Sequence, residues 1–470
     1  MDTLWLDVKH GIRTLARTPG LTVIAVITVA LGIGANTGMF SVVHGVLLSP
    51  LPYPESHRLV RLTETIRRNE VNVSYPNFLD WRARSYALQE VATYNPFFSV
   101  TLTGVERAEL LPGAAAESQL FRLLGVQPVL GRIFAEEEER PGGPSAVLIS
   151  HSLWERQFGR DPNIIGRSIR LEMTPATVIG VLPPEFRLAR ADIWFPLGPV
   201  LNRNMLDRGN HPGFQAFGRL RPGVTLEQAR EEMNAIAAAL EQEYPASNKN
   251  VGIRVRPLLN SLVGRVQPML VVLLGTVSFV LLIACANVSN MLLARALGRS
   301  REVAVRAALG AGTSRLFRLF LVESLLLGLL GGAGGLLVAW WGVDALLAAQ
   351  PGVIPRAAEI GIQAPVLLYG LAVTLLCSAI FGTVPAWRAM RANLVDALKQ
   401  GVRGAGRSGS TRLRWALVTS QVALSMVLLI GAGLMLRTLL ALSSVDPGFR
   451  ADGLLAYKVH LPGQSYDEPE

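Results

Sequence analysis

The sequence contains little charge and very few lysines or cysteines. Only 17% of its 470 residues are charged, and four of them are lysine. Hydrophobic residues make up 50% and the mean hydropathy is +0.35. This balance argues against a soluble domain and more strongly against disorder. Two cysteines in a chain of this length exclude a disulfide scaffold and a zinc ribbon.

The sequence also lacks a nucleotide-binding loop. A Walker A loop needs a lysine followed by Ser or Thr, whereas the four lysines here precede His10, Asn250, Gln400 and Val459. No nucleophile–base pattern, paired intramembrane acids or closely spaced metal ligands are present. The sequence therefore predicts a chain that is not an enzyme, binds no cofactor or metal, and takes its energy from another chain.

Five long apolar runs are the strongest positive signal. Each exceeds the roughly 20 residues that a helix needs to cross the hydrocarbon core, and together they contain one acid, Glu323. Backbone groups in lipid must bond internally, so we expect all five to be membrane-spanning helices. The runs are Leu21–Leu48, Val266–Ala294, Leu319–Val343, Ile360–Trp387 and Trp415–Leu436.

Positive charge is concentrated in the short segments between the runs. Residues 295–318 carry a net charge of +5 and residues 388–414 one of +6, whereas the long segment 49–265 carries only +2. The positive-inside rule then places the N-terminus and both basic segments in the cytoplasm, and 49–265 outside. The net charge of +10 is therefore concentrated in segments next to the membrane, and we expect no nucleic-acid partner.

The segment 49–265 reads as one globular domain. A capping box at Thr225 and Gln228 starts a helix, with strands expected at 214–220 before it and from Val251 after it. A strand at 58–62 and a helix at 75–84 complete a small α/β unit. The stretch 96–210 between these parts is expected to be an inserted β-rich subdomain.

Two features favour contacts at the inner membrane surface. Leu4, Val8, Ile12 and Leu15 share one face of a helix within residues 1–20, which suits an amphipathic helix lying on the membrane. Glu323 follows Arg318 by about one turn. Its carboxylate is expected to reach toward the membrane surface or to form a local pair, rather than to act in a proton relay.

The basic segment after the second run predicts a short helix over 301–311. Glu302 and Arg306 are spaced to pair, and Gly310 can end the helix. From the residues alone, this helix is equally a topological connector or a docking surface for a cytoplasmic partner. In the third run, small residues four apart allow close helix packing; they are Gly328, Gly331, Gly332 and Gly335.

The order of one span, a large outer domain and three spans resembles the permease subunits of macrolide-exporter-type (MacB-like) ABC transporters, including FtsX-like permeases. The segment 301–311 leading to 320–324 looks like the loop motif of that family, and 75–81 and 131–134 look like parts of its periplasmic core. The stretch 31–37 looks like a duplicated subgroup that often lacks an adjacent ATPase gene.

The apolar runs predict an α-helical transmembrane protein of five spans, and the resemblance implies a large α+β periplasmic domain between spans one and two. The expected domains are a cytoplasmic amphipathic helix at 1–20, a span at 21–48, a MacB-like periplasmic core at 49–265, an FtsX-like three-span domain at 266–400, and the start of a second permease unit at 401–470 with its span at 415–436.

The resemblance implies a permease in a bacterial inner membrane. A separate cytoplasmic ATPase would bind and hydrolyse ATP, and the permease would transmit this to its outer domain for efflux or export. Arg301, Glu302, Arg306, Leu309 and Gly310 would then contact this ATPase. Further expected partners are the lipid bilayer, a second copy or permease half, and a periplasmic or outer-membrane protein. The alternative is a signalling or regulatory membrane protein that uses the same coupling without export.

Overall fold

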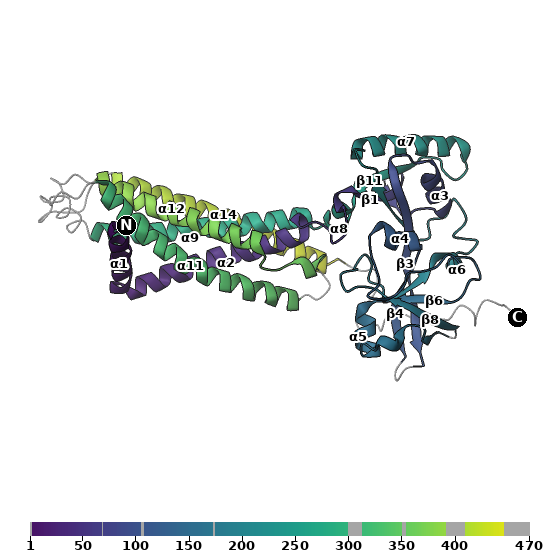
Figure 1. Ribbon diagram of the computed structural model, residues 1–470. Helices are drawn as coiled ribbons and strands as arrows, with labels where there is room; N and C mark the ends of the chain where they lie inside the picture. Colours follow the sequence, from purple (N-terminus) through teal and green to yellow (C-terminus); the bar gives the residue numbers. More distant parts are fainter. Residues whose placement is uncertain are drawn as a thin grey trace, which may run out of the picture. The chain divides into compact units, whose positions relative to one another are not determined.

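The computed structural model describes residues 2–67, 69–104, 108–172, 174–298, 313–349, 354–391 and 409–445. The chain divides into two compact units. Of the described residues, those up to Ser49 and from Val263 to Val445 form the helix unit, and those between Pro50 and Leu262 form the outer domain. Figure 1 shows the long helices of the first unit and the mixed sheet of the second.

All five predicted spans are present as helices of the helix unit. Their apolar stretches are 20 to 33 residues long, enough to cross a membrane. The helices are α2 (Pro19–Val43), which continues into the π-helical turn η1 (His44–Leu48), α9 (Gln267–Gly298), α11 (Thr313–Ala349), α12 (Ala364–Arg391) and α14 (Gly409–Ser443).

The packing of the helix unit centres on α11. This helix contacts α2 on one side and α12 on another, while α9 contacts α2, α12 and α14. A further helix, α1 (Asp2–Arg17), lies across one end of the long helices and contacts α11 and α2 (Figure 1). We refer to this end as the α1 end.

The outer domain is a single eleven-stranded mixed sheet with helices on it. Its main path runs in the order β11-β1-β10-β3-β4-β9-β6-β8-β5. The strands are β1 (Leu59–Ile66), β2 (Asn69–Val71), β3 (Leu88–Thr103), β4 (Glu109–Ala116), β5 (Leu130–Gly131), β6 (Ala146–Ile149), β7 (Ser168–Leu171), β8 (Thr174–Val181), β9 (Ile193–Pro196), β10 (Gln215–Leu220) and β11 (Val251–Pro257). The helical segments are η2 (Ser56–Arg58), α3 (Tyr75–Arg84), α4 (Ser118–Leu123), α5 (His151–Phe158), η3 (Pro162–Ile164), α6 (Leu197–Val200), α7 (Leu226–Glu243) and α8 (Leu258–Val263).

The structure joins the two parts that the sequence pattern separates. The strand β3 is 16 residues long. It pairs with β10 through residues 88–94 and with β4 through residues 94–102. The expected inserted subdomain therefore extends the sheet of the α/β unit instead of forming a sheet of its own, because one long strand belongs to both.

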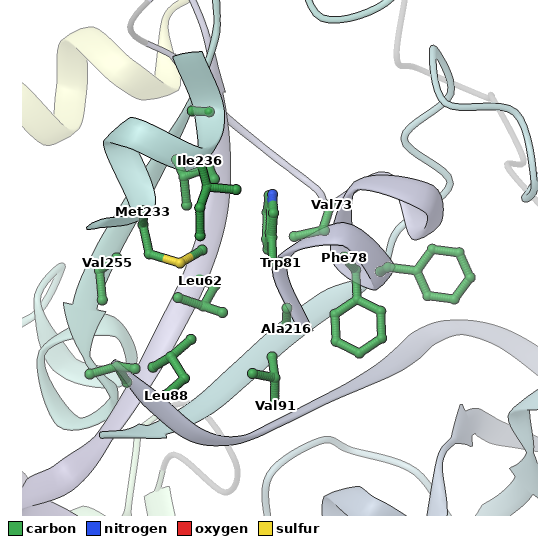
Figure 2. Close-up of a cluster of buried hydrophobic side chains, with 14 of the residues drawn as sticks. Leu62, Val73, Phe78, Trp81, Leu88, Val91, Ala216, Met233, Ile236 and Val255 are labelled. Carbon is green, nitrogen blue, oxygen red and sulfur yellow. The ribbon is translucent and has the colours of Figure 1, made fainter. Parts of the chain in front are cut away.

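The α/β part of the outer domain is held by the core between α7, α3 and the sheet. The predicted capping box is confirmed, because Thr225 accepts from the Gln228 amide and the Gln228 side chain accepts from the Thr225 amide. Met233 and Ile236 of α7 face the sheet, and Trp81 of α3 stands between them and Val73 (Figure 2). Burying such side chains contributes roughly 1.5–3 kcal/mol each.

One buried polar cluster ties the last loop before β10 to the start of the domain. The Glu64 side chain is fully buried and accepts hydrogen bonds from the Ser74 amide and the Asn77 side chain. His211 Nε2 lies 2.6 Å from Glu64 Oε2, and this hydrogen bond raises the pKa of His211 above its ordinary value. The imidazolium is therefore stabilised in the folded state.

We expect the outer domain to lose stability as the pH rises. The folded-state pKa of His211 lies above the unfolded value, so its stabilisation is complete below a pH of about 6.5 and is lost as the pH passes through the folded-state pKa. The melting temperature of the domain in the full chain, measured by calorimetry from a pH of about 6 to about 9, should fall, and His211→Gln should flatten the curve. The control is His57→Gln, which replaces an exposed histidine and keeps the hydrogen bond between His211 and Glu64, so the fall with pH should remain. A wild-type slope in the His211→Gln variant would contradict this assignment.

Candidate coupling site in the helix unit

At the α1 end, five residues from three helices form a polar cluster that we call the latch. They are Asp7 and Thr14 of α1, Arg295 of α9, and Arg318 and Glu323 of α11. The latch joins the last turns of α9 to the first turns of α11. The segment between these two helices, residues 299–312, contains the predicted docking residues.

The central contact of the latch is an ion pair between α9 and α11. Arg295 Nη1 lies 3.1 Å from Glu323 Oε1, and the two side chains are only 9% and 6% exposed. Arg295 also donates to the Thr14 carbonyl of α1. Its position in the last turn of α9 places a cation beside the negative end of the helix dipole. Removing one partner of such a buried pair strongly destabilises the folded protein, because the other charge stays buried without compensation.

A second ion pair fixes α1 to the beginning of α11. Arg318 Nε donates to Asp7 Oδ2 at 2.7 Å, and the Asp7 side chain is 8% exposed. Close approach of the helices is possible because Gly11 faces α11, where a Cβ would lie 2.8 Å from Leu326 Cδ1. The local pairing of Glu323 with Arg318 expected from their spacing is therefore wrong, since each residue pairs with a different helix.

The amphipathic pattern of α1 also differs from expectation. Its buried side carries Asp7, Gly11, Thr14 and Leu15, whereas Ile12 is 54% exposed. The reason is that the latch selects the polar side of α1 for packing on α11. The apolar periodicity of α1 alone could not reveal this, because the arginines that bind Asp7 and the Thr14 carbonyl lie on other helices.

The four glycines singled out in α11 lie against two different helices. A Cβ on Gly331 would lie 2.5 Å from Val29 of α2, and one on Gly335 would lie 3.1 Å from the Ala30 carbonyl oxygen. Gly328 and Gly332 face α12 instead, where added Cβ atoms would lie 1.8 Å from Ser378 Oγ and 2.6 Å from Thr374 Oγ1. At these positions a larger side chain would push the helix backbones apart.

The end of α2 opposite to α1 is held by the connection between α11 and α12. Arg356 donates to the carbonyls of Val46 and Ser49, at 3.0 and 2.8 Å. Gly45 lies so close to this connection that a Cβ would be 2.8 Å from the Glu359 carbonyl oxygen. Both ends of α2 and its middle are therefore fixed to neighbouring elements of the helix unit.

A polar contact inside the apolar region joins three helices. The buried Asn36 of α2 donates to Ser278 Oγ of α9 at 3.1 Å and accepts from the Tyr369 hydroxyl of α12. The Tyr369 ring also stacks on Phe40, with centroids 3.8 Å apart. Polar side chains in lipid need such partners. The signal that could have pointed to this contact is Asn36, the only amide side chain in the run Leu21–Leu48.

Arg301, Glu302, Arg306, Leu309 and Gly310, which the loop motif assigns to ATPase contact, lie outside the described residues. The structure describes the residues on either side of them, which are the ends of α9 and α11 held by the latch. Within the described ranges, no group of three or more His, Cys, Asp or Glu side chains could hold a metal ion.

Two families match successive parts of the chain. Residues 22–236 match the MacB-like periplasmic core domain, and residues 274–394 match the FtsX-like permease C-terminal domain. This pair of domains, together with the five described helices that are apolar enough to cross a membrane, is the domain composition of an ABC-type permease of the MacB/FtsX-like kind.

Curated relatives of this class share modest identity with the chain. It is 27% identical over 285 residues to the macrolide export ATP-binding/permease protein MacB of Chromobacterium violaceum, covering 59% of this chain and 42% of that protein. It is 23% identical over 289 residues to the probable syringafactin export ATP-binding/permease protein SyfD of Pseudomonas syringae pv. tomato, covering 60% and 41%. The chain thus spans less than half the length of these relatives.

Among solved structures, a domain of a putative permease from Porphyromonas gingivalis matches with a TM-score of 0.37 at 17% identity, covering 44% of this chain and 93% of that one. The periplasmic region of MacB from Actinobacillus actinomycetemcomitans matches with a TM-score of 0.35 at 14% identity, covering 48% and 95%. Likeness at this level specifies no function.

Proposed function

We propose that this chain is the permease subunit of an ABC exporter and that it transmits ATP hydrolysis by a separate cytoplasmic ATPase to the outer domain. The observation that carries the proposal is the contact between α11 and α2. The helix α11 begins directly after the predicted docking segment, and its glycines bring its backbone against Val29, Ala30 and Gly34 of α2. At its far end α2 leads through Ser49 into the outer domain.

The close packing supports transmission of a displacement along this route. Gly34 of α2 approaches α11 so closely that a Cβ would lie 2.8 Å from the Gly335 carbonyl oxygen. Packed interiors of this kind deform little and pass displacement from one element to the next. A push on the segment 299–312 would therefore shift α11 and, with it, α2.

The latch supports the same proposal at the other end of the route. Arg295 and Glu323 hold the ends of α9 and α11 together, so a protein bound to the segment between them acts on both helices at once. The chain itself has no Walker A lysine, which is why the proposal assigns ATP binding to a partner.

The partner can be identified by purifying the natively expressed chain in mild detergent and sequencing the proteins that copurify. Recovery of an ABC-type ATPase in stoichiometric amount supports the proposal. Recovery of a sensor kinase without an ATPase would instead favour the signalling alternative. The transported substrate would follow from loss of resistance or secretion when the gene is deleted.

The proposed orientation predicts opposite labelling of two introduced cysteines. Tyr86 of the outer domain is 73% exposed, and Gly312 follows the basic segment that the positive-inside rule assigns to the cytoplasm. In a background lacking Cys285 and Cys377, a maleimide that cannot cross the inner membrane should label Tyr86→Cys in intact cells. Gly312→Cys should react only after permeabilisation. The reverse pattern would overturn the orientation.

A further inference from the structure

The outward side of α1 carries an apolar edge and a basic edge. Trp5 and Ile12 are 67% and 54% exposed. The three basic side chains Lys9, Arg13 and Arg17 are exposed as well. They are spaced four residues apart and therefore form one stripe along the helix. The opposite side of α1 is occupied by the latch contacts of Asp7 and Thr14.

The placement of α1 brings this outward side to the membrane surface. The helix lies across the long helices rather than along them (Figure 1). It ends at Arg17, two residues before the apolar helix that starts at Pro19. When the long helices cross a bilayer, α1 therefore lies in the plane of the headgroups. An amphipathic helix in this position inserts its apolar edge and points its cations at lipid phosphates.

We propose that the outward side of α1 binds anionic phospholipid headgroups, and that this lipid contact holds the latch closed. Charge complementarity supports this occupant, because the three cations are exposed along one side of α1. Since the other side of the same helix binds Arg318 and Arg295, a lipid that immobilises α1 also fixes the ends of α9 and α11.

Each Lys or Arg near an anionic membrane surface strengthens binding about fivefold. Loss of all three cations should therefore weaken the attachment of α1 by about 100-fold. The inference depends neither on the ATPase nor on the side of the membrane, because both leaflets of a nanodisc carry the test lipid.

The test is hydrogen exchange of the α1 amides in the full chain. Nanodiscs would contain either phosphatidylcholine alone or phosphatidylcholine with about one third phosphatidylglycerol. The wild type should show markedly slower exchange with phosphatidylglycerol, by up to about 100-fold. The difference should vanish in about 1 M salt, where the Debye length is about 3 Å. The variant Lys9→Gln/Arg13→Gln/Arg17→Gln should exchange equally in both lipids.

The matched control removes three exposed arginines from the outer domain, as Arg187→Gln/Arg190→Gln/Arg203→Gln, and should keep the lipid dependence. If the triple α1 variant does not insert, the single Arg13→Gln should reduce the lipid effect by about fivefold. Equal exchange of wild-type α1 in both lipids would overturn the inference. So would a triple variant that retains the lipid effect but loses a protein partner, because the stripe would then be a protein-docking surface.

Discussion

Replacing Glu323 with alanine should destabilise the helix unit by about 3–5 kcal/mol, because the substitution leaves the charge of Arg295 buried without its partner. The two side chains are 6% and 9% exposed and come from different helices. Loss of the pair should therefore separate the ends of α9 and α11. The effect can be measured as the shift in denaturant-induced unfolding of the full chain in mixed micelles.

The same helix provides the control for this experiment. Asp344 lies on α11 and is exposed, so Asp344→Ala removes an acid of similar chemistry without uncovering a buried cation. The double variant Arg295→Met/Glu323→Leu should recover most of the lost stability, because apolar side chains of similar volume can replace a buried pair. If Glu323→Ala unfolds like Asp344→Ala, the pair does not stabilise the unit.

The second large effect is expected at the docking segment. Replacing Arg301 and Arg306 with glutamate should abolish association with the ATPase, because like charges facing each other across an interface cost several kcal/mol. Helix propensity changes little, so the chain should still insert and fold. Association can be measured by copurification, and coupling by the ATPase rate with and without the permease.

A matched variant tests whether the change in net charge alone, and not its position in the docking segment, causes the loss of ATPase binding. Arg187→Glu/Arg190→Glu makes the same change of charge at exposed positions of the outer domain, and it should bind the ATPase normally. Wild-type association of Arg301→Glu/Arg306→Glu would make the segment a topological connector only.

Local rules predicted much of the fold. The five spans follow from length and polarity, and the capping box at Thr225 follows from a spacing of three residues. The helix Tyr75–Arg84 occurs at the bounds expected from the sequence. Each of these features depends on residues within one turn or one strand, so the sequence pattern contains the information directly.

Features that depend on residues far apart in the sequence could not be predicted from the sequence pattern. Glu323 has Arg318 nearby in sequence, yet it pairs with Arg295, and Arg318 pairs with Asp7, which is 311 positions away. The continuous sheet depends on β3 pairing with both β10 and β4. Such choices are made by packing of whole elements. Spacing could indicate that the α11 glycines approach a helix, but only the structure assigns Gly331 to α2 and Gly328 to α12.

The most direct test of the coupling proposal is a distance measurement between the two units during ATP turnover. Spin labels at Tyr86→Cys in the outer domain and Trp341→Cys in α11 both occupy exposed positions, in a background without Cys285 and Cys377. Double electron–electron resonance measurements on the complex reconstituted with its ATPase would give the distance distributions with and without ATP. The proposal predicts that ATP changes the distribution and that Arg301→Glu/Arg306→Glu abolishes the change. Identical distributions with and without ATP, while the bound partner hydrolyses ATP, would contradict it.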